Sequence, residues 1–248
     1  MGVVYIGDRA VGKTHLALEL ANPQGDYVQI DLVNQNYPNL RANLLNLDGT
    51  AKPTQTIEKR SLDVQVRLST GMSKIPVDWI DSPGELFRRS WQSEHINEWQ
   101  DFKETVGKSE GIFLIVPPYR EILQPHIEPE NYITQQQWCN RFNRWTEFFI
   151  HDCPQARRIV ICLNKADLIY SDIEQEISKL AYLPHGSSLN WLQRHNYVVN
   201  SYFEPVTAQL EQINRSRSGL SVRCFITSIY HRSLLELPWI YLASYLAN

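Results

Sequence analysis

The stretch Gly7-Asp8-Arg9-Ala10-Val11-Gly12-Lys13-Thr14 has the pattern G-x-x-x-x-G-K-T and follows directly on an apolar run at residues 3–6. Small residues let a tight loop turn its backbone N–H groups inward around phosphate oxygens, and a helix that follows directs its positive end to the same place. In this pattern the Lys13 ammonium reaches the β and γ phosphates, and the Thr14 hydroxyl ligates Mg²⁺. The stretch therefore predicts a strand, a nucleotide-binding loop and a helix over residues 14–21. This context disfavours the alternative, a glycine-containing turn without a ligand.

Short apolar runs alternate with longer helix-like stretches along the rest of the chain. The runs cover residues 3–6, 62–68, 75–80, 112–116, 159–163 and 222–226, and the helical stretches cover 14–21, 91–106, 135–149 and parts of 172–214. Such alternation predicts an α/β fold of three layers, with a mostly parallel sheet of about six strands and helices on both faces. Apolar and polar residues alternate strictly at 62–68, and a turn-like segment follows at 70–73. We expect a hairpin there and an antiparallel edge strand.

The chain shows no internal repeat and no low-complexity tract, which favours a single domain over residues 1–248. Insertions are expected at about residues 117–137 and 170–218, because both connections are longer than α/β units usually need. Long insertions tend to carry function or partners. Residues 237–242 are apolar almost all round, so we expect this stretch to be buried, with docking on a partner as the alternative.

Composition excludes several classes of function. The 24 Lys and Arg residues and 27 Asp and Glu residues give a net charge of −3, which argues against a nucleic-acid-binding face and against adsorption to an anionic membrane. No apolar run is long enough to cross a bilayer and no leader precedes the first strand, so we expect no membrane anchor. The four cysteines form no C-x-x-C pair, which favours a reducing cytoplasm over a disulfide scaffold or a zinc ribbon.

Three further short motifs follow predicted strands. They are Asp81-Ser82-Pro83-Gly84 (D-x-x-G), Asn164-Lys165-Ala166-Asp167 (N-K-x-D) and Thr227-Ser228-Ile229. Taken alone, D-x-x-G is a common turn and N-K-x-D suits a helix cap. Ligands of open α/β sheets bind at the carboxyl ends of the strands, where all these motifs are expected to meet.

In their order, the motifs resemble the Ras-like and translation-factor branch of P-loop GTPases, and the chain looks like a divergent, bacterial member, with a longer gap from Lys13 to Asp81 than in Ras. The resemblance implies that Asp81 holds Mg²⁺ through water and that the Gly84 amide contacts the γ-phosphate. It implies that Asp167 accepts two hydrogen bonds from guanine, which adenine cannot donate. Lys165 would pack along the base. Asn164 would connect the N-K-x-D segment, residues 164–167 (the base loop), to the G-x-x-x-x-G-K-T segment, residues 7–14 (the phosphate loop).

The last motif and the switch threonine fit the family less closely. The family usually has Thr-Ser-Ala where this chain has Thr227-Ser228-Ile229, and a backbone amide there contacts guanine O6, a role open to Ile229 beside Ser228. A switch Thr that ligates Mg²⁺ is expected among Thr50, Thr54 and Thr56. Thr56 is favoured because Thr56-Ile57-Glu58 resembles the family's switch sequence.

The expected chemistry is Mg²⁺-dependent hydrolysis of GTP to GDP by a molecular switch, with Lys13, Thr56, Gly84, Glu85 and Arg9 as candidate catalytic residues. Ras-like members place Gln and translation factors place His where this chain has Glu85, which is alternatively a helix-start residue. Arg9 replaces a usual Gly, and would act as an internal arginine finger or obstruct a partner's finger. We therefore expect slow hydrolysis, accelerated by a protein partner or by a nucleotide-dependent dimer.

Two alternative functions stay open. One is a pseudo-GTPase, a GTP-bound scaffold that binds a protein effector without efficient hydrolysis. The other is an ATPase or a kinase, which requires the match at Asn164–Asp167 to be accidental. His95 and Cys162 are interpreted as structural residues. Trp91 and Trp99, eight residues apart on one expected helix, are interpreted as contacts with the core or with a partner.

Overall fold

The computed structural model describes residues 2–8, 10–31, 37–52, 57–81, 86, 89–169, 172–184 and 189–246. In this part of the chain seven strands form one sheet in the order β2-β3-β4-β1-β5-β6-β7. The strands are β1 (Val3–Gly7), β2 (Val28–Asp31), β3 (Glu58–Leu68), β4 (Gly71–Asp81), β5 (Gly111–Val116), β6 (Arg158–Asn164) and β7 (Ser221–Thr227).

The predicted α/β class and mostly parallel sheet are confirmed, since β4, β1, β5, β6 and β7 all run in parallel. The predicted hairpin is also present: β3 and β4 pair antiparallel from Glu58↔Asp81 to Leu68↔Gly71. Its turn ends at Gly71, whose φ of 130° favours glycine.

The structure differs from the predicted sheet slightly in the number of strands, and the predicted edge strand is wrong. The described sheet has seven strands rather than about six, because β2 was not expected: Val28-Gln29-Ile30-Asp31 is short and contains only two apolar residues. β2 pairs antiparallel with β3, so β3 is not the edge strand. Alternation in β3 correctly indicates one core-facing side, with Val64 and Val66 buried, but it says nothing about which strands lie alongside.

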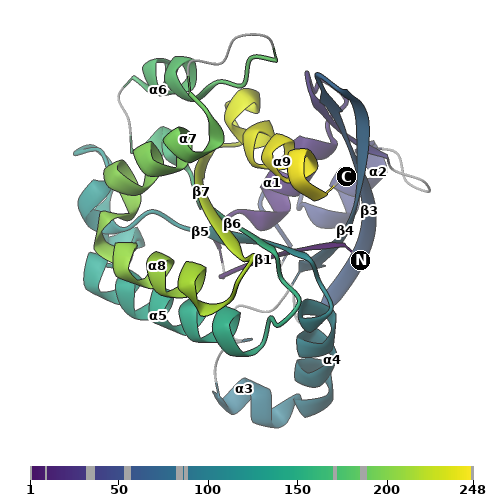
Figure 1. Ribbon diagram of the computed structural model, residues 1–248, viewed down its shortest axis with the longest axis vertical. Coiled ribbons are helices and arrows are strands. Elements are labelled where there is room, and N and C mark those ends of the chain that lie inside the picture. The colour runs from purple at the N-terminus through teal and green to yellow at the C-terminus, as the bar shows by residue number, and fades with distance from the viewer. Residues whose placement is uncertain are drawn as a thin grey trace.

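Helices cover both faces of the sheet (Figure 1). They are α1 (Lys13–Ala21), α2 (Tyr37–Leu44), α3 (Arg89–Glu94), α4 (Ile96–Gly107), α5 (Gln135–His151), α6 (Ile173–Leu180), α7 (Trp191–Val198), α8 (Thr207–Ser216) and α9 (Arg232–Leu246). α1 and α9 pack together on one face, and α5 and α8 lie side by side on the other. Short 3-10 turns at Arg120–Ile122, Pro129–Asn131, Ala166–Leu168 and Glu204–Val206 and a π-helical turn at Val199–Phe203 complete the described helical segments.

The single helix expected over residues 91–106 is instead two helices. His95 leaves the helical region (φ −122°, ψ 47°) and separates α3 from α4, so Trp91 and Trp99 lie on different helices. The His95 ring stacks on Trp91 at 4.6 Å between centroids, and its Nδ1 lies 3.1 Å from the Trp91 carbonyl oxygen. This packing agrees with a structural role for His95. Helix α2 was not expected.

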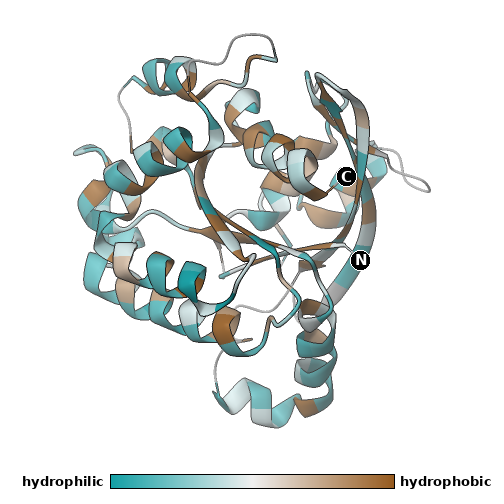
Figure 2. Ribbon diagram, in the orientation of Figure 1, coloured by the Kyte–Doolittle hydropathy of each residue, from teal (hydrophilic) through white to brown (hydrophobic). Residues whose placement is uncertain are grey.

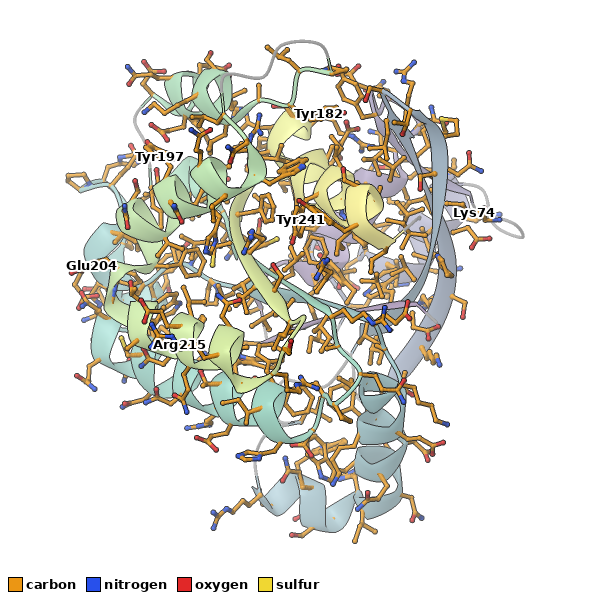
Figure 3. The ribbon with its side chains drawn as sticks, in the orientation of Figure 1. Lys74, Tyr182, Tyr197, Glu204, Arg215 and Tyr241 are labelled. Carbon is orange, nitrogen blue, oxygen red and sulfur yellow. The ribbon has the colours of Figure 1, made fainter. Side chains whose placement is uncertain are left out.

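The apolar C-terminal stretch is buried, as predicted. All of residues 237–242 are buried within α9. Trp239 stacks on Phe113 at 4.7 Å, and Tyr241 packs against Phe225 at 5.6 Å and Trp191 at 5.5 Å (Figure 3). Apolar residues gather along the strands and α9, while polar residues predominate on α5, α6 and α8 (Figure 2). Cys162 is fully buried on β6, as expected for a structural thiol.

The four cysteines, Cys139, Cys153, Cys162 and Cys224, are free thiols. Among the described residues, no helix combines the length and the hydropathy needed to cross a lipid bilayer.

The segment predicted as the second insertion covers the free edge of β7 with side-chain acceptors. Asn214 Oδ1 accepts from the Val222 amide at 2.8 Å, and His195 Nδ1 accepts from the Cys224 amide at 3.0 Å. Side chains therefore satisfy two N–H groups that an edge strand would otherwise expose. To accept this bond, Nδ1 must be unprotonated, and burial, with Arg223 nearby, lowers the pKa of His195 from 6.5 to about 4.

We expect protonation of His195 to weaken the fold at acid pH. Below pH 6.5 the unfolded histidine takes up a proton, while the folded one does so only near pH 4. As the pH decreases from 6.5 to about 4, this group therefore lowers the free energy of unfolding by up to about 1.4 kcal/mol per pH unit. Urea unfolding of the wild type and of His195→Asn, whose Oδ1 can accept the same bond without titrating, would measure this. Identical pH dependence in the two proteins would contradict the assignment.

Candidate functional site

Both glycines of the phosphate-loop motif occupy positions where a side chain would not fit. β1 ends at Gly7 and α1 begins at Lys13. A Cβ at Gly7 would lie 2.4 Å from the Ile115 carbonyl oxygen of β5, and a Cβ at Gly12 would lie 2.7 Å from Asn164 Nδ2. Gly12 also has a φ of 90°, a conformation that side chains rarely adopt. The loop can thus approach two neighbouring strands closely only with glycine at these positions.

The Lys13 side chain folds back over the loop that precedes it. Its Nζ donates to the carbonyl oxygens of Gly7 at 3.0 Å and Asp8 at 2.9 Å, and the residue is only 6% exposed. Thr14 follows in the first turn of α1 and is also buried. The ammonium, the Thr14 residue and the positive end of α1 therefore lie together at the end of β1.

Two residues of the candidate site have an unusual backbone conformation. Ala10 in the phosphate loop has a φ of 58°, and Lys165 in the N-K-x-D segment has a φ of 63°. Within the described residues these are the two non-glycine residues with positive φ. Such strain clusters at functional sites, where the surrounding structure holds it in place.

A chain of buried hydrogen bonds joins three motifs that are far apart in the sequence. Asn164 Nδ2 donates to the Val11 carbonyl oxygen at 2.8 Å, and Asn164 Oδ1 accepts from Thr227 Oγ1 at 3.2 Å. Asn164 is 2% exposed and Thr227 is 1% exposed. The carboxyl ends of β1, β6 and β7 are thereby fixed relative to one another.

The Asp167 carboxylate is oriented by the last motif. Ser228 Oγ donates to Asp167 Oδ1 at 2.5 Å, and the same hydroxyl accepts from the Tyr230 amide at 3.2 Å. Ser228 is fully buried, and Ile229 is partly buried against the core. One carboxylate oxygen of Asp167 is therefore held by a protein donor.

Buried polar residues are concentrated at this edge of the sheet. Of the ten buried polar or charged residues in the described part of the chain, five lie here: Lys13, Thr14, Asn164, Thr227 and Ser228. Burying polar groups costs free energy unless they are paired, so a cluster of paired ones marks a polar part of the interior. The ends of the strands are thus the place in the fold where a polar ligand is expected.

Several predicted site residues cannot be placed. Arg9, Thr54, Thr56, Gly84 and Glu85 lie outside the described residues. Asp81 ends β4, but its side chain is likewise outside the description. Of the three candidate switch threonines only Thr50 is described, and its hydroxyl donates to Asp48 Oδ1 at 2.7 Å in an exposed turn. The switch threonine and the D-x-x-G contacts stay predictions.

The contacts that support the phosphate loop from α5 were not predicted. Arg141 Nη1 lies 3.7 Å from Asp8 Oδ2, and the Trp145 side chain also hydrogen-bonds to the Asp8 carboxylate. Burial raises the pKa of Asp8, and Arg141 and Lys13 oppose that shift. Because these contacts are non-local, no local pattern could have indicated them.

The segment predicted as the first insertion supports the base loop in a similar way. The Gln124 amide donates to the Leu168 carbonyl oxygen at 3.0 Å, and Gln124 Nε2 donates to that of Asp167 at 3.0 Å. The Tyr132 ring lies under the Lys165 ammonium, with 5.6 Å from Nζ to its centroid. Sequence reasoning missed both residues.

No protein-family model and no curated protein matches this chain. Among solved structures, the chain is similar to the crystal structure of a GTP-binding protein from the hyperthermophilic archaeon Sulfolobus solfataricus in complex with GDP. The identity is 13% and the TM-score 0.47, over 99% of this chain and 53% of that one. The chain thus spans about half the length of that protein, and its own site residues carry the functional conclusion.

Proposed function

We propose that this protein binds GTP and GDP with Mg²⁺ and hydrolyses GTP slowly, as a molecular switch of the Ras-like kind. One observation carries the proposal: Asn164 links the base loop to the phosphate loop, while Ser228 orients the Asp167 carboxylate beside them. A nucleotide has a base and a phosphate chain, and this arrangement offers a polar group for each.

Asp167 makes the site selective for guanine over adenine. A carboxylate accepts hydrogen bonds only, and guanine offers it two adjacent donors, N1–H and the exocyclic amine. Adenine has an acceptor at N1, so it lacks that pair. Lys165, in its left-handed conformation next to Ala166, packs its stem along the base.

The phosphate loop supplies the binding of the phosphates. Lys13 and the N-terminus of α1 bring positive charge to the end of β1, and the loop N–H groups of residues 8–14 add donors. Oxygen donors suit Mg²⁺, and the buried Thr14 hydroxyl, the Asp81 carboxylate and the Thr56 hydroxyl would hold the ion. When bound, the ion neutralises charge on the β and γ phosphates.

Hydrolysis depends on the residues expected around the γ-phosphate. Phosphoryl transfer requires positioning of water and neutralisation of charge more than a strong base. Lys13 provides charge, while Gly84, Glu85, Thr56 and Arg9 are the remaining candidate contacts to the γ-phosphate. Glu85 can accept from water but cannot donate to a phosphate, which favours a low intrinsic rate that a protein partner or a dimer raises.

A GTP-bound scaffold is the second candidate function. The described part of the 170–218 segment contains the α-helices α6, α7 and α8 and presents the apolar side chains Leu183 and Leu192, which are 55% and 52% exposed. Insertions of this length tend to carry function or partners, which favours a protein partner for this segment. In this alternative the nucleotide is structural.

Two measurements on the purified protein test the proposal. Chromatography of the nucleotide released on denaturation is expected to show GDP or GTP. Phosphate release from added GTP is expected to require Mg²⁺ and to run below about 1 s⁻¹, the low end of typical enzyme rates. Adenine nucleotide in the released fraction would contradict guanine binding, fast unaided turnover would contradict the slow switch, and bound GTP without phosphate release would favour the scaffold.

A further inference from the structure

The segment 119–134 lies against the base loop and is held there at both of its ends. At one end the Tyr119 ring packs on Trp138 at 5.0 Å, and Trp138 Nε1 donates to the Pro117 carbonyl oxygen at 2.9 Å. At the other end, Thr134 caps α5 through a reciprocal pair of bonds with Gln137. Both ends of the segment are therefore attached to the N-terminal part of α5, and its middle contacts residues 165–168.

Internal hydrogen bonds fix the position of Tyr132 within this segment. Arg120 Nη2 donates to the Tyr132 carbonyl oxygen at 3.3 Å, and Arg120 Nε donates to that of Pro129 at 3.0 Å. The Tyr132 amide donates to the same Pro129 carbonyl oxygen at 3.1 Å, and the Arg120 amide donates to that of Ile133 at 2.9 Å. The Tyr132 ring is thus presented from a turn that is bonded on both sides.

The ring receives the ammonium of Lys165, 5.6 Å from its centroid. An ammonium over an aromatic face is attracted by the ring without any neutralising charge. Ala166 separates Lys165 from Asp167, and no ion pair within 4.0 Å joins the two among the described residues, although the Asp167 charge acts on the Lys165 ammonium. An aromatic partner suits this place, because a carboxylate partner for Lys165 would compete with guanine for Asp167.

We propose that Tyr132 is the positioning residue for Lys165, and that Tyr132 and Gln124 together make the 119–134 segment the outer support of the guanine pocket. The inference rests on the proposed function and deepens it. Tyr132 holds the Lys165 stem in the plane where it packs along the base, and Gln124 holds the backbone of Asp167. Losing either support loosens the pocket and shortens the residence time of the nucleotide.

The test compares Tyr132→Leu with Tyr132→Phe in the full chain, using fluorescent GDP and competition by GDP and IDP. Tyr132→Leu is expected to raise the Kd for GDP and its dissociation rate by about 10-fold, within the range that a partly buried cation–ring contact provides. Tyr132→Phe keeps the ring face and should match the wild type. Gln124→Glu places an anionic oxygen against the Asp167 carbonyl and should weaken GDP as well.

IDP separates a loss of contact along the purine face from a loss at the Asp167 carboxylate, because displacing that carboxylate would weaken GDP more than IDP. IDP lacks the exocyclic amine but keeps the purine face, so Tyr132→Leu should weaken GDP and IDP by the same factor. A wild-type Kd for GDP in Tyr132→Leu, or equal losses in Tyr132→Leu and Tyr132→Phe, would overturn the inference and leave guanine binding intact. A wild-type protein that binds no guanine nucleotide would overturn the inference together with the proposed function.

Discussion

Replacement of Asp167 by Asn is expected to weaken GDP binding by about 100-fold or more, because a donor then faces guanine where an acceptor stood and one charge-assisted hydrogen bond is lost. The same change should favour xanthosine diphosphate, whose carbonyl replaces the exocyclic amine and accepts from the new amide. Competition between GDP and XDP for a fluorescent nucleotide measures both effects.

Ser228→Ala is the matched control for this reversal of base preference. It removes the donor that holds Asp167 Oδ1 and leaves the carboxylate in place. We expect weaker binding of GDP by roughly 10-fold, in line with the loss of one hydrogen bond to a charged group, and no gain for XDP. Unchanged GDP affinity in Asp167→Asn would remove Asp167 as the reader of the base.

Replacement of Lys13 by Ala is expected to weaken both GDP and GTP by at least about 100-fold, since a desolvated charge-assisted contact to phosphate is lost. Lys13→Arg should fail to restore binding. The Lys13 ammonium is a compact donor held between the carbonyl oxygens of Gly7 and Asp8, and the larger planar guanidinium does not fit that position. Calorimetric titration, with circular dichroism as the check on folding, measures the effect.

Lys74→Ala controls for the loss of a positive charge. Lys74 lies near the β3–β4 turn, is 55% exposed, and pairs with Asp63 at 2.7 Å (Figure 3). Nucleotide affinity should be unchanged in this variant. Equal losses in Lys74→Ala and Lys13→Ala would show a non-specific effect of charge and contradict the role assigned to Lys13.

The features predicted best from the sequence are those that depend on local backbone conformation and on the burial of a single strand. Gly7 and Gly12 are required by close approach and by a positive φ, and these demands produce the motif that located the loop. The apolar runs predicted six of the seven described strands because their side chains are buried. The position of Asn164 was implied by the family resemblance and not by its residue type.

What the sequence did not predict depends on contacts between distant segments. β2 forms because β3 pairs with it, and its four residues give no pattern of their own. The division between α3 and α4 depends on the backbone conformation of one residue, His95. Arg141, Gln124 and Tyr132 support the two loops from separate segments, and nothing in their local sequence indicates which loop each one meets.

Calorimetric titration of nucleotide-stripped protein with GDP and with ADP, in the presence of Mg²⁺, tests guanine recognition most directly. The described arrangement of Asp167, Ser228 and Asn164 predicts that GDP binds at least about 100-fold more tightly than ADP, because adenine leaves the carboxylate without its two donors. Equal affinities, a preference for ADP, or no binding of either nucleotide would contradict it.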